Sequence, residues 1–218
     1  MICPMGLGTN VPTMTHAENA GPEPPEPPGD DALLQRAQPE RATVNPDGSS
    51  VARTIDGVIV HQPPVHVDHR GALVEMFTRD DFWEHDFAYA YQTSIRPNTL
   101  KGWYAHERKN DRYHLVRGEL LLCLYDDRPG SPTRGLSQTL VISERSARQV
   151  FIPNHVWHLS LNVGTEEAIL VNLPTAKYNH AAPDRLHIPW DSPLIPVDVR
   201  GFLPLSYAGP QVTDAGPC

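Results

Sequence analysis

The feature that most constrains the fold is a series of short apolar runs that extends from about Ile55 to Val171. About ten such runs follow one another at a spacing of roughly ten residues, and turn-forming residues separate most of them. Alternation of apolar and polar residues is the pattern of a β-strand with one buried face. Helical periodicity is almost absent. The sequence therefore predicts an antiparallel β-sandwich or β-barrel rather than an α/β sheet.

The segments that flank this series have a different composition. The first 50 residues contain nine of the 23 prolines in the chain. Such a segment buries too little apolar surface to offset the entropy lost on ordering. We therefore expect a disordered or extended Pro-rich arm over 1–50, a single barrel domain over 51–200 and a C-terminal tail over 201–218.

Charge and cysteine content exclude several classes of partner. The net charge is −8, and no basic stretch is interleaved with aromatic residues, so we expect no nucleic-acid partner. No apolar run approaches the length of a membrane span, and the N-terminus lacks the pattern of a signal peptide. Cys3, Cys123 and Cys218 form no disulfide framework or zinc pattern. The expected protein is cytoplasmic, does not contact a membrane and acts on a small molecule.

Two segments of the series carry polar residues at characteristic positions. The first places Tyr104, His106 and Asp111 before a turn at Gly118, and the second carries His158. This spacing resembles the two site-bearing hairpins of the cupin superfamily, G…H-x-H-x(3,4)-E-x(6)-G and P-x-G-x(2)-H-x(3)-N. Tyrosine stands at the first histidine, and aspartate at the glutamate. The resemblance implies an antiparallel cupin-type β-barrel, or jelly roll.

Strand parity then predicts which side chains share a cavity. Residues two apart on a strand face the same way, so Tyr104 and His106 share a face. Parity from Asp111 places Tyr113 inside the barrel and His114 outside. Small barrels bind ligands in their mouths. We therefore expect the four polar side chains of the two hairpins to converge there as the catalytic set.

Further motifs match a known enzyme family in the same order along the chain. They are Asp68–Gly71 with Glu75, Gln92, Lys101–Tyr104, Asp127–Thr133, Phe151–His158, and Tyr178 with Trp190–Pro193. Together they resemble the dTDP-4-dehydrorhamnose 3,5-epimerase family, the sugar-nucleotide epimerases of the cupin superfamily. The resemblance implies a homodimer, a dTDP-sugar as the type of substrate, and no required cofactor. The predicted substrate-binding residues are Arg70, Glu75, Gln92 and Lys101, with Trp103 and Tyr178 as aromatic walls.

The same resemblance indicates that the catalytic positions differ. In the family, a histidine supported by an aspartate removes protons next to the sugar carbonyl, a lysine stabilises the enolate oxygen, and a tyrosine returns the proton. Tyr104 stands at the base, Asp111 at the lysine, Asn172 near the tyrosine and Ser192 at the aspartate. A neutral phenol is a poor base at pH 7, and a carboxylate repels an enolate. These substitutions argue against ordinary 3,5-epimerisation.

The sequence therefore predicts an isomerase-like enzyme of sugar-nucleotide or secondary metabolism. It would transfer a proton next to a carbonyl, with His106 or His158 as the base and Tyr104 as the acid or oxyanion donor. One alternative is a repurposed cupin that catalyses cyclisation or another step on a non-sugar, polyketide-like intermediate. Another is a non-catalytic cupin that binds a ligand.

A metal site is a further hypothesis for the same residues. His106, Asp111 and His158 form a set of two imidazoles and one carboxylate, which suits Fe(II), Zn or Mn. The alternative is that these side chains line a wet, metal-free pocket, as the epimerase resemblance implies.

Overall fold

The computed structural model describes residues 32–48, 50–78, 86–204 and 207. The chain divides into two units, Met1–Val51 and Ala52–Cys218. In the first unit, the described residues form a short helix, α1 (Ala32–Arg36), and one antiparallel bridge between Val44 and Ser50. Most of the predicted N-terminal arm and of the predicted C-terminal tail lies outside the described residues. Over the described part of the chain, no helix has the length and apolar character needed to cross a bilayer.

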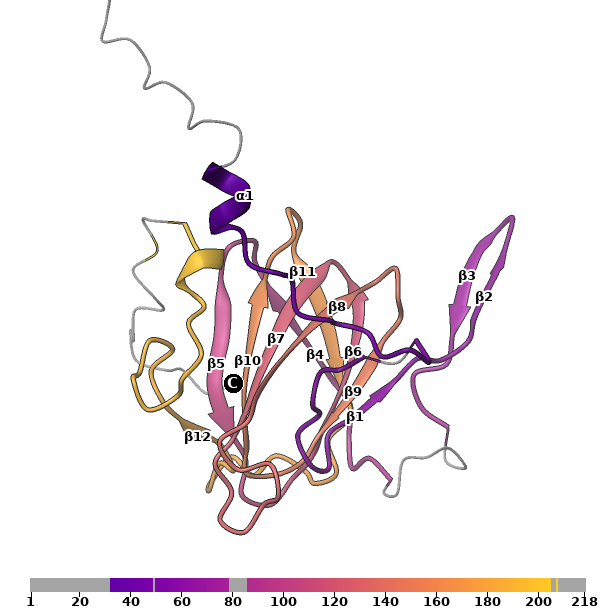
Figure 1. Ribbon diagram of the computed structural model, residues 1–218. Helices are drawn as coiled ribbons and strands as arrows, with labels where there is room; N and C mark the ends of the chain where they lie inside the picture. The colour runs from indigo at the N-terminus through magenta and orange to yellow at the C-terminus, as the bar shows by residue number, and fades with distance from the viewer. Residues whose placement is uncertain (1–31, 49, 79–85, 205–206, 208–218) are drawn as a thin grey trace, which may run out of the picture. The chain divides into compact units, whose positions relative to one another are not determined.

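The second unit is built from two five-stranded antiparallel sheets (Figure 1). The first sheet has the order β1 (Ile59–His61), β9 (Gln149–Ile152), β6 (Asp111–Arg117), β11 (Ala168–Asn172) and β4 (Tyr91–Ile95). The second has the order β12 (Leu186–His187), β5 (Leu100–Ala105), β10 (Val156–Asn162), β7 (Glu119–Asp126) and β8 (Ser137–Ser143). A separate hairpin is formed by β2 (Val65–Asp68) and β3 (Gly71–Val74), and a 3-10 turn, η1, spans Arg200–Phe202. This arrangement confirms the predicted antiparallel β-fold.

Strand β7 shows how the centre of the second sheet is buried on both faces. Leu120, Leu122 and Leu124 belong to the main hydrophobic core, whereas the alternate residues Leu121 and Cys123 belong to a second core. Alternate side chains of a strand point to opposite faces, so this run of apolar residues serves two clusters at once. The second core is completed by residues of β5, β10 and the C-terminal segment, namely Leu100, Trp103, Leu159, Leu161, Ile195 and Val199. The C-terminal segment therefore covers the outer face of this sheet.

A close approach of two backbones aligns β5 with β10. A Cβ atom at Gly102, whose φ is +135°, would lie 2.6 Å from the Cα atom of Leu159. Glycine is the residue that permits such an approach, because it has no side chain. The two strands pair so that Tyr104 lies opposite His158. Two of the predicted catalytic residues are therefore neighbours across the sheet.

The Asp127–Thr133 motif has a structural role at the end of β7. The buried Asp126 carboxylate accepts hydrogen bonds from Arg128 Nε at 2.9 Å, Ser131 Oγ at 2.6 Å and Thr133 Oγ1 at 2.7 Å. Arg128 also donates to the backbone oxygen of Asp56 at 2.7 Å. Burial alone would raise the pKa of Asp126, but these hydrogen bonds outweigh it and lower the pKa. The turn therefore fastens the start of the barrel to the end of β7.

Candidate functional site

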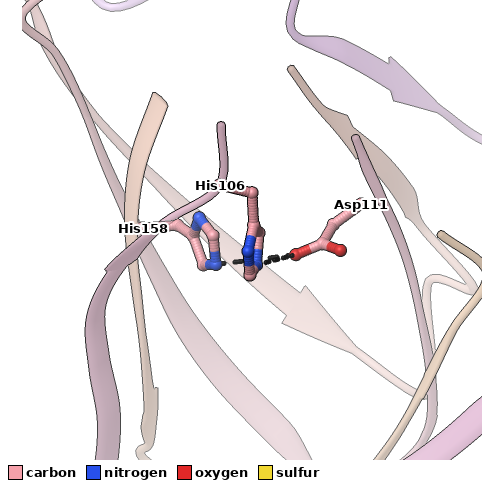
Figure 2. Close-up of side chains that lie close together, drawn as sticks. All are labelled: His106, Asp111 and His158. Atoms are coloured by element: carbon pink, nitrogen blue, oxygen red, sulfur yellow. Dashed lines mark ion pairs between the residues drawn. The ribbon is translucent and has the colours of Figure 1, made fainter. Parts of the chain in front are cut away.

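Polar side chains from five segments gather at one end of the barrel. His106 follows the last residue of β5, Asp111 is the first residue of β6, and His158 lies in β10. Asn172 ends β11, and Tyr91 begins β4. Figure 2 shows His106 and His158 directed toward the carboxylate of Asp111. The three are 7%, 3% and 1% exposed, respectively, so their interactions take place away from bulk water.

Both imidazoles face the same oxygen of Asp111. The Nε2 atoms of His106 and His158 lie 3.2 and 3.6 Å from Asp111 Oδ2. The Nδ1 atoms face backbone oxygens instead, those of Asp184 for His106 and Val156 for His158. A carbonyl oxygen can only accept a hydrogen bond, so Nδ1 carries the hydrogen in both rings. A carboxylate can only accept, so an Nε2 atom that hydrogen-bonds Asp111 also carries a hydrogen, whereas an Nε2 atom without one is left to accept a proton.

The other oxygen of Asp111 has a separate set of partners. Asn172 Nδ2 donates to Asp111 Oδ1 at 2.9 Å, and Lys109 Nζ lies 3.3 Å from the same oxygen. The Asn172 amide group also donates to the Tyr91 hydroxyl at 2.8 Å and accepts the backbone N–H of Arg112 at 3.0 Å. The carboxylate is therefore fixed in orientation, with imidazoles at one oxygen and an amide and an ammonium at the other.

Sequence reasoning missed Lys109. It lies in the turn between β5 and β6, where a lysine would normally be solvated, yet it is only 4% exposed. The Asp184 carboxylate accepts the backbone N–H groups of Glu107, Arg108 and Lys109 at 3.0, 3.1 and 3.1 Å. This clamp holds the turn against the barrel. Strand parity gave no signal for Lys109, because this residue lies in a turn and not on a strand.

Burial and local charge set the protonation states of the site. Burial lowers the pKa of His158 to about 4, so this imidazole is neutral at pH 7. Burial alone would raise the pKa of Asp111, but a hydrogen bond from His106 and the charge of Lys109 lower it below its usual range. Burial raises the pKa of Tyr91 and keeps its phenol protonated. The site therefore combines a carboxylate, a neutral imidazole and a phenol.

Tyr104 is the half-buried member of the predicted catalytic set. Its ring centroid lies 6.4 Å from that of His158 and 5.5 Å from that of His187. The guanidinium carbon of Arg185 lies 4.7 Å from the centre of the Tyr104 ring. Tyr104 thus connects the buried cluster to the exposed cationic side chain of Arg185.

Three predicted substrate-binding residues do not join this cluster. Arg70 lies on the β2–β3 hairpin, where its side chain is 78% exposed and pairs with Asp68. The Glu75 carboxylate accepts a hydrogen bond from the Thr78 hydroxyl at 3.2 Å. Gln92 is exposed on β4 and alternates with Tyr91, so it points away from the barrel interior. One chain therefore does not bring these three side chains and the cluster together around a single ligand.

The other three predicted binding residues are placed differently from one another. Lys101 is exposed, and its Nζ atom donates to Thr93 Oγ1 at 2.7 Å. Tyr178 is half-buried. Trp103 is fully buried in the second core, where its Nε1 atom donates to the backbone oxygen of Trp190 at 3.2 Å. The structure therefore places Trp103 in the packing of the fold, not on the wall of a ligand site as the sequence suggested.

Comparison with known proteins agrees with this architecture. The profile of the family described as dTDP-4-dehydrorhamnose 3,5-epimerase matches residues 52–211. The probable low-salt glycan biosynthesis epimerase Agl13 of Haloferax volcanii is 36% identical over 139 residues, which cover 63% of this chain and 89% of that protein. The spore coat polysaccharide biosynthesis protein SpsL of Bacillus subtilis is 30% identical over 141 residues, covering 65% of this chain and 93% of SpsL.

A solved structure shows the same fold. The dTDP sugar isomerase from Desulfovibrio desulfuricans G20 superimposes with a TM-score of 0.64 at 22% identity, covering 67% of this chain and 93% of that one. Its fold supports the predicted cupin-type barrel, and the profile match extends over most of the second unit. The chain therefore belongs to the dTDP-4-dehydrorhamnose 3,5-epimerase family.

Proposed function

We propose that this protein is an isomerase-class enzyme that moves a proton at the carbon next to the keto group of a dTDP-linked sugar. Family membership supports the reaction class and the type of substrate. The observation that carries the proposal is the buried cluster in which His106 and His158 face Asp111. An imidazole held against a carboxylate is a suitable group to accept a proton from carbon.

The proposed step uses groups that lie within one cluster. The C–H bond next to the carbonyl breaks, and its proton passes to an imidazole Nε2 atom. The electron pair forms a C=C bond, and the carbonyl oxygen becomes an enolate. Tyr104, the half-buried phenol opposite His158, returns a proton to carbon or donates to the oxygen. The family resemblance expects the base at the position of Tyr104. The base proposed here, His106 or His158, is more deeply buried than Tyr104.

Solvent exchange measures this step directly. The protein would be incubated in D₂O with a dTDP-4-keto-6-deoxyhexose, and the sugar C3–H and C5–H signals would be followed by proton NMR. We expect at least one of these signals to decay as deuterium enters, and the variant His158→Ala to slow the decay by about 10²-fold or more. A folded wild-type protein that neither exchanges these protons nor binds the dTDP-sugar in calorimetry would contradict the proposed function.

The homodimer implied by the family stays part of this proposal. The β2–β3 hairpin carries Arg70 together with exposed apolar side chains, including Val67 at 74% and Leu73 at 59% exposure. Exposed apolar groups beside a charged one are suited to contact with a second subunit. Such a contact would provide a role for Arg70, which lies outside the cluster of its own chain.

A second candidate function is that of a metal-dependent cupin. Nitrogen atoms of His106 and His158 and an oxygen of Asp111 lie within 4.8 Å of one another. Both Nδ1 atoms face backbone oxygens, which is how metal-binding histidines are commonly oriented. The donor set fits Zn, Fe(II) or Mn, and a bound cation would polarise the substrate carbonyl. The ammonium of Lys109 beside Asp111 opposes this function, because it already neutralises the carboxylate.

Elemental analysis separates the two candidates. For the metal-free enzyme, we expect no stoichiometric Zn, Fe or Mn in the purified protein and unchanged proton exchange after dialysis against a chelator. About one metal ion per chain, together with loss of exchange on chelation and recovery on adding the metal, would instead identify the metal-dependent enzyme.

A further inference from the structure

The carboxylate of Asp184 binds three consecutive backbone N–H groups of the β5–β6 turn. Glu107 donates to Oδ1 at 3.0 Å, and Arg108 and Lys109 donate to Oδ2, each at 3.1 Å. Successive N–H groups that converge on one anion form a concave anion-binding site. Burial alone would raise the pKa of Asp184, but these hydrogen bonds outweigh it and lower the pKa. The turn is therefore fastened by hydrogen bonds to a charged group, which are stronger than the neutral ones of an ordinary turn.

The same residue also contacts His106 directly. The backbone oxygen of Asp184 faces Nδ1 of the imidazole, whose Nε2 atom lies 3.2 Å from Asp111 Oδ2. A hydrogen bond at one ring nitrogen fixes the orientation of an imidazole and the nitrogen that carries its hydrogen. Asp184 thus holds the ring of His106 through its backbone, and the three residues that follow His106 through its side chain.

Strand pairing explains how Asp184 comes to lie beside this turn. In β12, His187 lies opposite Tyr104 of β5. The antiparallel register, continued by three residues, places Asp184 opposite Glu107, the first residue whose N–H it binds. The position of His106 therefore depends on a segment of the chain about 80 residues away, and not on its own hairpin alone.

A second set of hydrogen bonds holds the same turn at other atoms. Asn154 Nδ2 donates to the backbone oxygen of Glu107 at 2.9 Å, and the Asn154 backbone N–H donates to Asn110 Oδ1 at 2.8 Å. Thr175 Oγ1 accepts the backbone N–H of Asn110 at 3.0 Å. These bonds should keep the turn folded when the Asp184 carboxylate is removed. Asn154 offers a matched comparison, because its side chain binds this turn at the backbone of Glu107 rather than at His106.

We propose that Asp184 is a positioning residue, which holds His106 in the orientation that directs its Nε2 atom toward Asp111. The carboxylate fixes the backbone after the imidazole, and the carbonyl oxygen fixes the ring itself. The orientation stands on these contacts, whereas its effect on a reaction rate rests on the proposed function. A displacement of about 1 Å at a reactive group can cost on the order of 10²-fold in rate, so a residue that touches no substrate can still limit turnover.

Hydrogen exchange and NMR test the positioning without any substrate. The variant Asp184→Ala keeps the backbone oxygen and loses the carboxylate. The three amide hydrogens that bind the carboxylate should then exchange at least about 10-fold faster than in the wild-type protein. The Nδ1 signal of His106 in ¹H–¹⁵N spectra should also move. Asn154→Ala should leave that signal, and the two amides that donate to Oδ2, unchanged. An Asp184→Ala variant with wild-type exchange at these amides, or with an unmoved His106 signal, would overturn the proposal.

Kinetics test the consequence for the reaction. Asp184→Ala should lower kcat for proton exchange into a dTDP-4-keto-6-deoxyhexose by about 10–10²-fold with KM changed by less than about 3-fold, because it displaces the base and removes no contact to the substrate. Asp184→Asn keeps one acceptor oxygen and should recover part of the rate. Asn154→Ala should retain kcat within about 3-fold of the wild-type value.

The outcomes separate the two proposals. Circular dichroism would verify that each variant is folded. A folded Asp184→Ala variant with faster amide exchange but wild-type kcat overturns the positioning role in the reaction. A wild-type protein that exchanges no substrate protons overturns the proposed function instead, and leaves the amide exchange and the His106 signal to decide whether Asp184 holds the imidazole.

Discussion

Replacement of Asp111 by asparagine should reduce the rate of proton exchange into the substrate by about 10²–10⁴-fold. The carboxylate is the group that both imidazoles and Lys109 share, at 3.2, 3.6 and 3.3 Å. An amide of the same size cannot hold the proton that passes through the imidazoles, and it no longer balances the ammonium. The NMR exchange assay measures the rate, with Asp191→Asn as the control at another aspartate near the closing motif. An Asp111→Asn variant with nearly full activity would show that the cluster does not carry the chemistry.

The same substitution should also lower the free energy of unfolding, by about 3 kcal/mol, because it leaves the ammonium of Lys109 buried without its counter-charge. Urea denaturation followed by circular dichroism would measure this loss. The double variant Asp111→Asn/Lys109→Met removes the uncompensated charge, so it should be more stable than Asp111→Asn alone. If the free energy of unfolding falls in the double variant by the sum of the decreases in the two single variants, the two side chains are not coupled.

Replacement of Trp103 by alanine should lower the free energy of unfolding by about 3–5 kcal/mol, the usual cost of deleting a fully buried large side chain. Trp103 is 0% exposed and packs with Leu159, Leu161 and Ile195 in the second core. Its indole N–H also loses the backbone oxygen of Trp190. Chemical denaturation would measure the loss, and Trp103→Phe should recover part of it.

Binding measurements distinguish this packing role from a ligand role. Below the denaturation midpoint, Trp103→Ala should leave KM for the dTDP-sugar nearly unchanged, because the indole lies in the second core and not beside Asp111. Leu194→Ala is a control at a side chain that is 73% exposed, where a change in stability within about 0.5 kcal/mol is expected. A large rise in KM with normal stability would instead place Trp103 in the binding site.

Much of the fold could be predicted because alternation is a local property. Successive residues of the run that becomes β7 alternate between the two cores, and the run that becomes β10 contributes Leu159 and Leu161 to the second core. The spacing also predicted that Tyr104, His106 and Asp111 share a face; in the structure His106 Nε2 lies 3.2 Å from Asp111 Oδ2, and Tyr104 pairs with His158 across the sheet. Parity from Asp111 placed Tyr113 inside the barrel, where its ring lies 6.0 Å from that of His158.

The rest of the site depends on contacts that no local pattern contains. Lys109 looks like a surface residue of a polar turn until Asp184, 75 residues further along the chain, is known to bind that turn. The orientation of Asp111 depends on a hydrogen bond from Asn172, which lies 61 residues further along the chain. Arg70 and Gln92 match family motifs, but a motif specifies residue types and not the direction in which a side chain points. Tertiary contacts therefore decided which polar residues became neighbours.

The clamp by Asp184 has a consequence for the order in which the molecule is made. Chains are synthesised from the N-terminus, and structure can form while synthesis continues. A nascent chain that ends before residue 184 already contains β4 to β11, and with them Asp111, His158 and Asn172. It lacks the carboxylate that fixes the Glu107–Lys109 turn. The strands that carry Asp111, His158 and Asn172 are therefore translated before the residue that holds Lys109 beside them.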